Sequence, residues 1–318
     1  MPINADKPHL WKADIAQSVD LFNNWFMEFA PAAYRETRVK TTESVQAALR
    51  MTADLQSITP ETLVENPSVL PTLRMSTAPP LARDRLVGLA YANKNLVLTM
   101  EEQAKLPPRM SRGTVQRELQ SICKVLTRLI DRELFPWLQE GRAPQDIERY
   151  RASTIVADRL CGAVADPIVR NAQEQRQLKL IADYLTARGY RQEQLPSGSQ
   201  ITDMDAGTFA FRVNVPVGSG EKTVNIPIDV VIQPKRPRMS RIPILLEAKS
   251  AGDFTNPNKR RKEEATKIRQ LRETYGEDAS LVLFLCGYFD SGYLGYEAAE
   301  GIDWVWEHRM DDLLQLGL

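Results

Sequence analysis

The sequence has few cysteines and histidines and lacks any long apolar run. Its three cysteines, Cys123, Cys161 and Cys286, are far apart and form no C-x-x-C pair, which argues against a disulfide framework and against a zinc site. The two histidines, His9 and His308, lack the spacing of metal ligands. No apolar run approaches the roughly 18 residues that span a bilayer, and no charged-then-apolar leader opens the chain. We therefore expect a cytoplasmic protein, neither secreted nor inserted in a membrane.

The charge of the chain is balanced overall but unevenly distributed. The 318 residues include 41 Lys or Arg and 41 Asp or Glu, and this balance at first argues against nucleic acid, whose phosphates attract cations. However, residues 235–267 hold ten Lys or Arg against four acids, whereas residues 297–312 hold six acids and one arginine. One face can therefore be basic on a neutral protein.

The first half of the chain has the pattern of helices. From about residue 13 to residue 150, apolar residues recur at helical spacing, as in Ile15, Val19 and Phe22, and prolines, as at Ala30-Pro31, predict breaks between helices. We therefore expect a mostly α-helical domain over residues 1–165.

The pattern changes after residue 165. Asp166-Pro167 is a typical helix start and Gly189 a typical stop, so a long helix is predicted between them. Glu174 lies one turn before Leu178 on the apolar stripe of that helix. An acid at this position faces either the interior of the fold or a site.

Strands dominate the remainder of the chain. Alternating apolar residues and turn signals predict three strands, a charged helix, two further strands and a short closing helix. The strands are expected at residues 209–217, 224–232, 242–248, 281–286 and 302–306, and the charged helix at 258–275. This order predicts an α/β (α+β) domain over residues 166–318, with a mixed central sheet flanked by helices.

Three ionisable residues alternate with the apolar residues of two neighbouring strands. The even-numbered residues of the strands at 224–232 and 242–248 are apolar, so Asp229, Glu247 and Lys249 are expected on the opposite face. Two carboxylates offer the hard oxygen ligands that Mg²⁺ prefers, and Mg²⁺ commonly bridges protein carboxylates to a phosphate.

This pattern fits the needs of phosphodiester hydrolysis, which are a cation at the phosphate, an activated water and a partner for the growing charge. Asp229 and Glu247 are the predicted metal ligands, the backbone carbonyl of Ala248 can add a third, and Glu174 is a weaker candidate. Lys249 is predicted to orient the attacking water or to help deprotonate it. The residues therefore predict a catalytic centre of a Mg²⁺-dependent nuclease.

The same residues resemble a known nuclease motif. Pro227-Ile228-Asp229 followed by Glu247-Ala248-Lys249 resembles the PD-(D/E)xK motif, with Pro-x-Asp in place of Pro-Asp. The chain is also similar to the XamI-type restriction endonucleases, through residues 244–256, the run Lys259-Arg-Arg-Lys-Glu-Glu264 and residues 73–86. The resemblance implies a PD-(D/E)xK core preceded by a helical domain that serves dimerisation or DNA wrapping.

The resemblance also implies an activity. It implies a type II restriction endonuclease of a restriction-modification system, which acts as a homodimer on double-stranded DNA and uses Mg²⁺ but no nucleotide cofactor. The implied recognition site is a short palindrome, GTCGAC. Because Lys259, Arg260 and Arg261 follow the site directly, they are expected to contact phosphates, and Asn256 and Asn258 to meet base edges or backbone.

Other interpretations remain open at this point. A bare E-x-K triplet occurs about once by chance in a chain of this length, and Glu247 and Lys249 could merely pair with neighbours on a solvated sheet face. A repair or junction-resolving nuclease of the same fold is an alternative that the large helical domain disfavours. A catalytically silent DNA-binding protein is a further alternative, which the intact Asp229, Glu247 and Lys249 disfavour.

Overall fold

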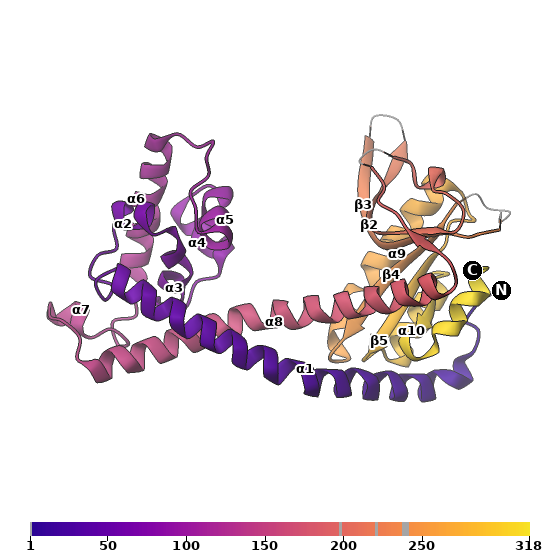
Figure 1. Ribbon diagram of the computed structural model, residues 1–318, viewed down its shortest axis with the longest axis horizontal. Helices are drawn as coiled ribbons and strands as arrows, with labels where there is room; N and C mark the ends of the chain where they lie inside the picture. The colour runs from indigo at the N-terminus through magenta and orange to yellow at the C-terminus, as the bar shows by residue number, and fades with distance from the viewer. Residues whose placement is uncertain (1, 197–198, 220–221, 237–241) are drawn as a thin grey trace. The chain divides into compact units, whose positions relative to one another are not determined.

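The computed structural model describes residues 2–196, 199–219, 222–236 and 242–318 (Figure 1). The chain forms two compact units, Met1–Phe29 with Arg170–Leu318, and Ala30–Val169. We call the first the sheet unit and the second the helical unit. Among the described residues, no helix combines the length and the apolar character that crossing a membrane requires.

Two long helices, α1 (Pro8–Met51) and α8 (Asp146–Ala187), contribute to both units. They continue through Pro31 and Pro167, so the predicted break at Ala30-Pro31 and the predicted helix start at Asp166 are wrong. A proline inside a helix removes one backbone hydrogen bond and disfavours the helix locally. In α8, however, apolar residues are buried on both sides of Pro167, among them Cys161 and Ile181. Packing of both halves therefore outweighs the local preference.

The helical unit combines parts of α1 and α8 with the helices that lie between them in the sequence. These are α2 (Pro60–Glu65), η1 (Pro67–Val69), α3 (Leu70–Met75), α4 (Arg83–Ala90), α5 (Lys94–Gln103), α6 (Arg112–Leu129) and α7 (Trp137–Glu140). Fully buried residues such as Leu73, Leu119 and Trp137 form its core. This part of the chain is helical, as the sequence predicted.

The sheet unit contains a six-stranded mixed sheet of order β1-β2-β3-β4-β5-β6. The strands are β1 (Arg191–Gln192), β2 (Thr208–Ser219), β3 (Lys222–Gln233), β4 (Ile244–Ala251), β5 (Leu281–Gly287) and β6 (Asp303–Trp306), and a short helix η2 (Ile201–Asp203) precedes β2. The pairs β2–β3 and β3–β4 are antiparallel, and the pairs β1–β2, β4–β5 and β5–β6 are parallel. The predicted mixed α/β architecture is confirmed.

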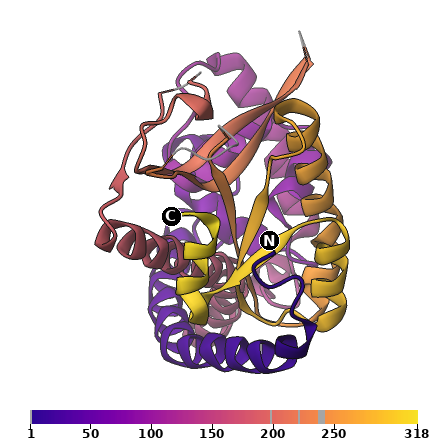
Figure 2. The ribbon, with the colours of Figure 1, turned by 90° about the vertical axis from the view of Figure 1, so that its right-hand side faces the viewer.

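Helices cover both faces of this sheet (Figure 2). On one face, α9 (Thr255–Tyr275) and α10 (Ser291–Ala299) contribute residues such as Ile268 and Leu294 to the core. On the other, α8 and η3 (Glu307–Leu316) contribute Ile181 and Leu313. We call these the α9 face and the α8 face. Helix α10 was not predicted, because its nine residues include two glycines and lack a clear apolar stripe.

The first residues of the chain belong to the sheet unit, which the expected boundary after residue 165 did not anticipate. The backbone N–H groups of Ile3 and Asn4 donate to the carboxylate of Asp303. In addition, the rings of Trp11 and Trp304 meet edge to face, with centroids 5.4 Å apart. Residues near both ends of the chain thus complete one core.

In both strands of the β2–β3 hairpin, the side chains switch from one face of the sheet to the other, at Arg212 in β2 and at Asp229 in β3. Val230 lies in the core of the α8 face, whereas Ile228, only two residues earlier, lies in the core of the α9 face. The backbone of Arg212 has a φ of 53°, which breaks the regular alternation of a strand. The prediction that all even-numbered residues of β3 share one face is therefore wrong, although it holds for Ile244 and Leu246 of β4.

Candidate active site

Asp229, Glu247 and Lys249 lie where β3 and β4 separate. The ladder between the two strands covers three residue pairs and ends at Val230 and Leu246, immediately beside Asp229 and Glu247. At that point Asp229 Oδ2 accepts a hydrogen bond of 2.9 Å from the backbone N–H of Ala248. The Asp229 side chain thus accepts a hydrogen bond that a backbone carbonyl of β3 would accept in a regular sheet. The three residues predicted from the sequence therefore lie together.

Glu247 is a buried carboxylate between two lysines. Its side chain is only 8% exposed, and its Oε1 lies 2.7 Å from Lys267 Nζ and 3.5 Å from Lys249 Nζ. Its Oε2 has no hydrogen-bond partner among the described residues. A buried oxygen without a partner is costly, so this atom is suited to accept a cation. The interpretation of Glu247 and Lys249 as a pair on a solvated face does not fit this burial.

Lys249 is held by a second buried acid. Its Nζ lies 2.6 Å from Glu264 Oε1, and the Glu264 side chain is 2% exposed. Burial lowers the pKa of Lys249, but the charges of Glu247 and Glu264 outweigh burial, so the pKa lies above its usual value. Lys249 is therefore a cation, which favours orientation of a water and stabilisation of negative charge over removal of a proton.

Burial changes the protonation of two acids around this centre. It raises the pKa of Asp229 to about 6, with a further contribution from the charge of Glu247. It also raises the pKa of Glu297, in α10, to about 8, with a contribution from Glu264. Glu297 is therefore largely neutral near neutral pH, which leaves the charge of Glu264 free to hold Lys249.

The other candidate ligand, Glu174, is paired with an arginine, although its charge also contributes to the raised pKa of Asp229. Its Oε1 lies 2.7 Å from Arg212 Nη2, and its side chain is 39% exposed. Among the residues that the structure describes, no group of three or more His, Cys, Asp or Glu side chains is arranged to hold a metal. A metal at this place would therefore rest on the Asp229 and Glu247 carboxylates, with backbone and water oxygens completing its coordination. That donor set suits Mg²⁺, which keeps several waters.

The residues that the sequence assigned to DNA contacts lie at the start of α9. The side-chain amide of Asn256 donates to Asp253 Oδ2 at 2.7 Å, and that of Asn258 donates to Asp290 Oδ2 at 3.1 Å. Both asparagines therefore make contacts that organise the start of the helix. The guanidinium of Arg261 lies over the ring of Tyr296, 4.8 Å from its centroid. The side chains of Lys259 and Arg260 lie outside the described residues.

Three residues at the centre were missed by the sequence analysis: Gln177, Glu264 and Lys267. Gln177, 1% exposed, donates to the backbone carbonyl of Lys249 at 3.3 Å. Glu264 lies four residues before Ile268, on the buried stripe of α9. This position was a usable signal, because an acid on an apolar stripe faces the interior or a site.

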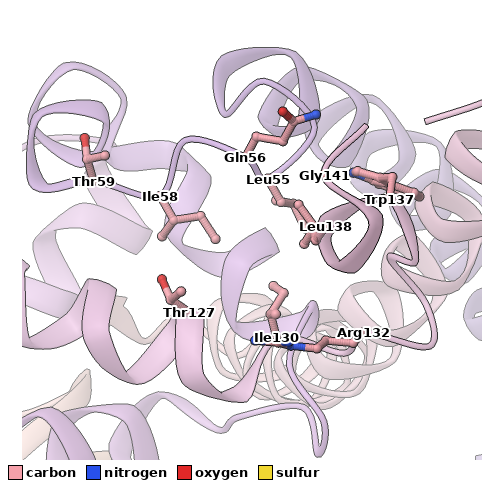
Figure 3. A pocket seen from close by; sticks show the side chains of 10 residues that line it. All are labelled: Leu55, Gln56, Ile58, Thr59, Thr127, Ile130, Arg132, Trp137, Leu138 and Gly141. Atoms are coloured by element: carbon pink, nitrogen blue, oxygen red, sulfur yellow. The ribbon is translucent and has the colours of Figure 1, made fainter. Parts of the chain in front are cut away.

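A hollow in the helical unit has a different character (Figure 3). It is a cavity of about 400 Å³ lined by apolar residues such as Leu55, Ile130 and Trp137 and by polar ones such as Thr59 and Arg132. None of its ten lining residues carries a carboxylate. This cavity therefore offers no ligands for the chemistry described above.

Comparison with known proteins defines the family. The model of the XamI restriction endonuclease family matches residues 53–306, and the chain belongs to this family of site-specific DNA-cleaving enzymes, as the resemblance implied. The type II restriction enzyme SalI of Streptomyces albus G is 58% identical over 315 residues, 99% of each chain. Protein VC1899 of Vibrio cholerae is 16% identical, with a TM-score of 0.28 over 80% of this chain and 55% of that one. That score is too low for any conclusion about the fold.

Proposed function

We propose that this restriction endonuclease is a type II enzyme that hydrolyses double-stranded DNA at a short palindromic site with Mg²⁺, using Asp229, Glu247 and Lys249. The observation that carries the proposal is the meeting of these side chains where β3 and β4 separate, with Glu247 Oε2 buried and without a hydrogen-bond partner among the described residues. The 58% identity to a type II restriction enzyme supports the activity. In this proposal the sheet unit is a PD-(D/E)xK core.

Each residue has a role in the proposed mechanism. Asp229 and Glu247 hold the metal ion, with the backbone carbonyl of Ala248 as a third oxygen. When bound, Mg²⁺ supplies positive charge at the scissile phosphate and lowers the pKa of a water. Lys249, held as a cation by Glu264, orients the attacking water and stabilises the charge that grows on the phosphate.

The palindromic site has a consequence for assembly. A palindrome is two-fold symmetric, so we propose a homodimer in which each copy presents one site to one strand. In this proposal residues 166–318 carry the chemistry, and residues 1–165 serve dimerisation or wrap the DNA. Glu174 stays a candidate for a second metal, which would require its release from Arg212.

Cleavage of long, unmethylated duplex DNA tests the proposal. We expect discrete fragments with Mg²⁺, none in EDTA, and none from the Glu247→Ala variant with Mg²⁺. Sequencing of the fragment ends gives the site, for which the family resemblance implies GTCGAC. A smear of products, or cleavage of branched DNA alone, would favour a repair nuclease. Binding without cleavage under any metal would favour a catalytically silent DNA-binding protein.

A second prediction concerns the acid that holds Lys249. Replacing Glu264 by glutamine keeps the shape of the side chain but removes the charge that holds the ammonium group. We expect the single-turnover cleavage rate to fall about 10- to 100-fold, because small displacements of a catalytic group have effects of this size. The affinity for DNA should be unchanged.

The matched control is Glu263→Gln, the same substitution at the neighbouring exposed residue of α9. It should cleave at the rate of the parent enzyme. In a Lys249→Ala background, Glu264→Gln should cause no further loss, because its effect acts through Lys249. Equal losses from Glu263→Gln and Glu264→Gln would contradict this role.

A further inference from the structure

The helical unit carries a concentrated basic surface on α6 and on the loop before it. Residues 104–130 contain six cations and one acid, Glu118, in a chain whose net charge is zero. All six cations are exposed. We call them the α6 patch: Lys105, Arg109, Arg112, Arg117, Lys124 and Arg128.

No ion pair among the described residues involves a member of this patch. Other cations of the same unit are paired, for example Arg74, Arg142 and Arg149. The one acid within the segment, Glu118, forms no ion pair with the patch among the described residues; its Oε2 accepts a hydrogen bond of 2.8 Å from the backbone N–H of Asn93. With six cations and one acid, the segment has a clear excess of positive charge.

The helical part of the patch forms a single stripe. Arg117, Lys124 and Arg128 are separated by seven and then four residues, a spacing that places them on one side of a helix. The buried residues of α6, which include Val115, Leu119 and Leu126, form the opposite side. The stripe therefore points to solvent along the outer face of the helix.

The dimensions of the stripe fit a nucleic-acid backbone. From Arg117 to Arg128 it extends roughly 16 Å, at 1.5 Å per residue. Each strand of a duplex presents a phosphate about every 3.4 Å along the axis, so several phosphates lie within this length. Long, flexible cations of this kind bind phosphates without reading sequence.

We propose that the α6 patch binds the phosphate backbone of duplex DNA and is a second DNA-contact surface, separate from the residues at the start of α9. The inference rests on the proposed function in one respect, that the substrate is duplex DNA. It assigns DNA wrapping to particular residues of the helical unit and predicts that these residues strengthen binding at all sequences alike.

The test compares two triple variants of the full chain that lose the same charge. The first is Arg117→Gln, Lys124→Gln and Arg128→Gln. The second, the control, changes three other exposed cations of the helical unit that are ion-paired: Arg38→Gln, Lys40→Gln and Lys94→Gln. Binding to a synthetic duplex is measured in EDTA over a range of salt concentrations, and thermal unfolding checks that both variants are folded.

We expect the affinity of the first variant for the duplex to be at least about tenfold lower at low salt. The slope of log affinity against log salt should become less steep by roughly 2 to 3, because each lost phosphate contact contributes about 0.9. The control should keep the slope of the parent enzyme. Equal losses in both variants, which indicate an effect of net charge alone, would overturn the proposal, as would no loss in either. A change in oligomeric state with an unchanged slope would instead assign the patch to a contact between copies.

The results that would contradict the proposed function differ from those that would contradict the role of the α6 patch. If the parent enzyme binds no duplex DNA and produces no fragments with Mg²⁺, the function itself is wrong. If the parent enzyme cleaves and the first variant binds with an unchanged salt slope, only the role of the α6 patch is wrong.

Discussion

Replacement of Asp229 by asparagine is expected to reduce DNA cleavage by about a thousandfold, because the loss of one charged ligand weakens the metal site and removes charge stabilisation at the phosphate. The local structure should remain, since the asparagine side-chain oxygen can still accept the hydrogen bond that Ala248 N–H gives to Asp229 at 2.9 Å. Single-turnover cleavage at saturating enzyme measures the loss. Cleavage within tenfold of the parent rate would exclude Asp229 as a metal ligand.

The same substitution is expected to increase stability in the absence of metal. Because the pKa of Asp229 is about 6 in the folded state against its usual value of 3.8, the folded state binds more protons than the unfolded state between these values. The stability of the parent enzyme therefore falls as pH rises through this window and stays lower above it. Asparagine does not titrate, so the variant lacks this loss.

Urea unfolding in EDTA at about pH 4 and about pH 8 measures the difference. At the higher pH we expect the variant to be more stable than the parent by about 1–2 kcal/mol, less than the full 1.36 kcal/mol per pKa unit because Asp229 is only part-buried. At the lower pH the gain should shrink. A gain that is the same at both pH values would contradict the raised pKa as its cause.

In the helical unit, replacement of Arg74 by methionine is expected to cost about 3 kcal/mol of stability, because it leaves the buried Glu101 without its main partner. Arg74 Nε and Nη2 lie 2.5 and 3.0 Å from the two carboxylate oxygens of Glu101, and the two side chains are 8% and 4% exposed. The Arg74 Nη1 group also donates to the backbone carbonyl of Leu81. Arg83 Nε, 3.0 Å from Glu101 Oε2, remains and limits the loss.

Arg38→Met is the matched control for this prediction. It breaks an ion pair of 2.7 Å with Asp158 in the same unit, but the two side chains are 57% and 59% exposed. Exposed pairs contribute little, so we expect a cost below about 1 kcal/mol. Urea unfolding followed by circular dichroism compares the two variants. Similar losses in both would show that burial is not the reason for the importance of Arg74.

Much of the sheet unit could be predicted from the sequence. The continuous apolar run that forms β5 was interpreted correctly, because a strand covered on both faces leaves a distinct pattern. The alternation at β4 also predicted a strand, but its half-buried character was wrong, since Ile244, Leu245 and Leu246 are all fully buried. The two long helices were not, since Pro31 and Pro167 are strong local signals for a break. Local signals of this kind cannot reveal packing partners that lie far away in the sequence.

The candidate site was predicted in outline only. The spacing of Glu247 and Lys249 on one strand identified a possible centre, and the structure places Asp229 beside them. The contacts of Glu264 and Lys267 could not be deduced from spacing, because they depend on how α9 packs on the sheet. Charge patterning was ambiguous in the same way, since the ion pairs that neutralise a cation are often distant in sequence.

The change of facing at Arg212 and Asp229 has a consequence for how the sheet unit unfolds. Each strand of the β2–β3 hairpin contributes residues to the core on the α8 face and to the core on the α9 face. Neither layer can therefore separate from the sheet without loss of contacts that support the other. We expect the two layers to open together as one cooperative unit, so that the geometry around Asp229 persists only while both are intact.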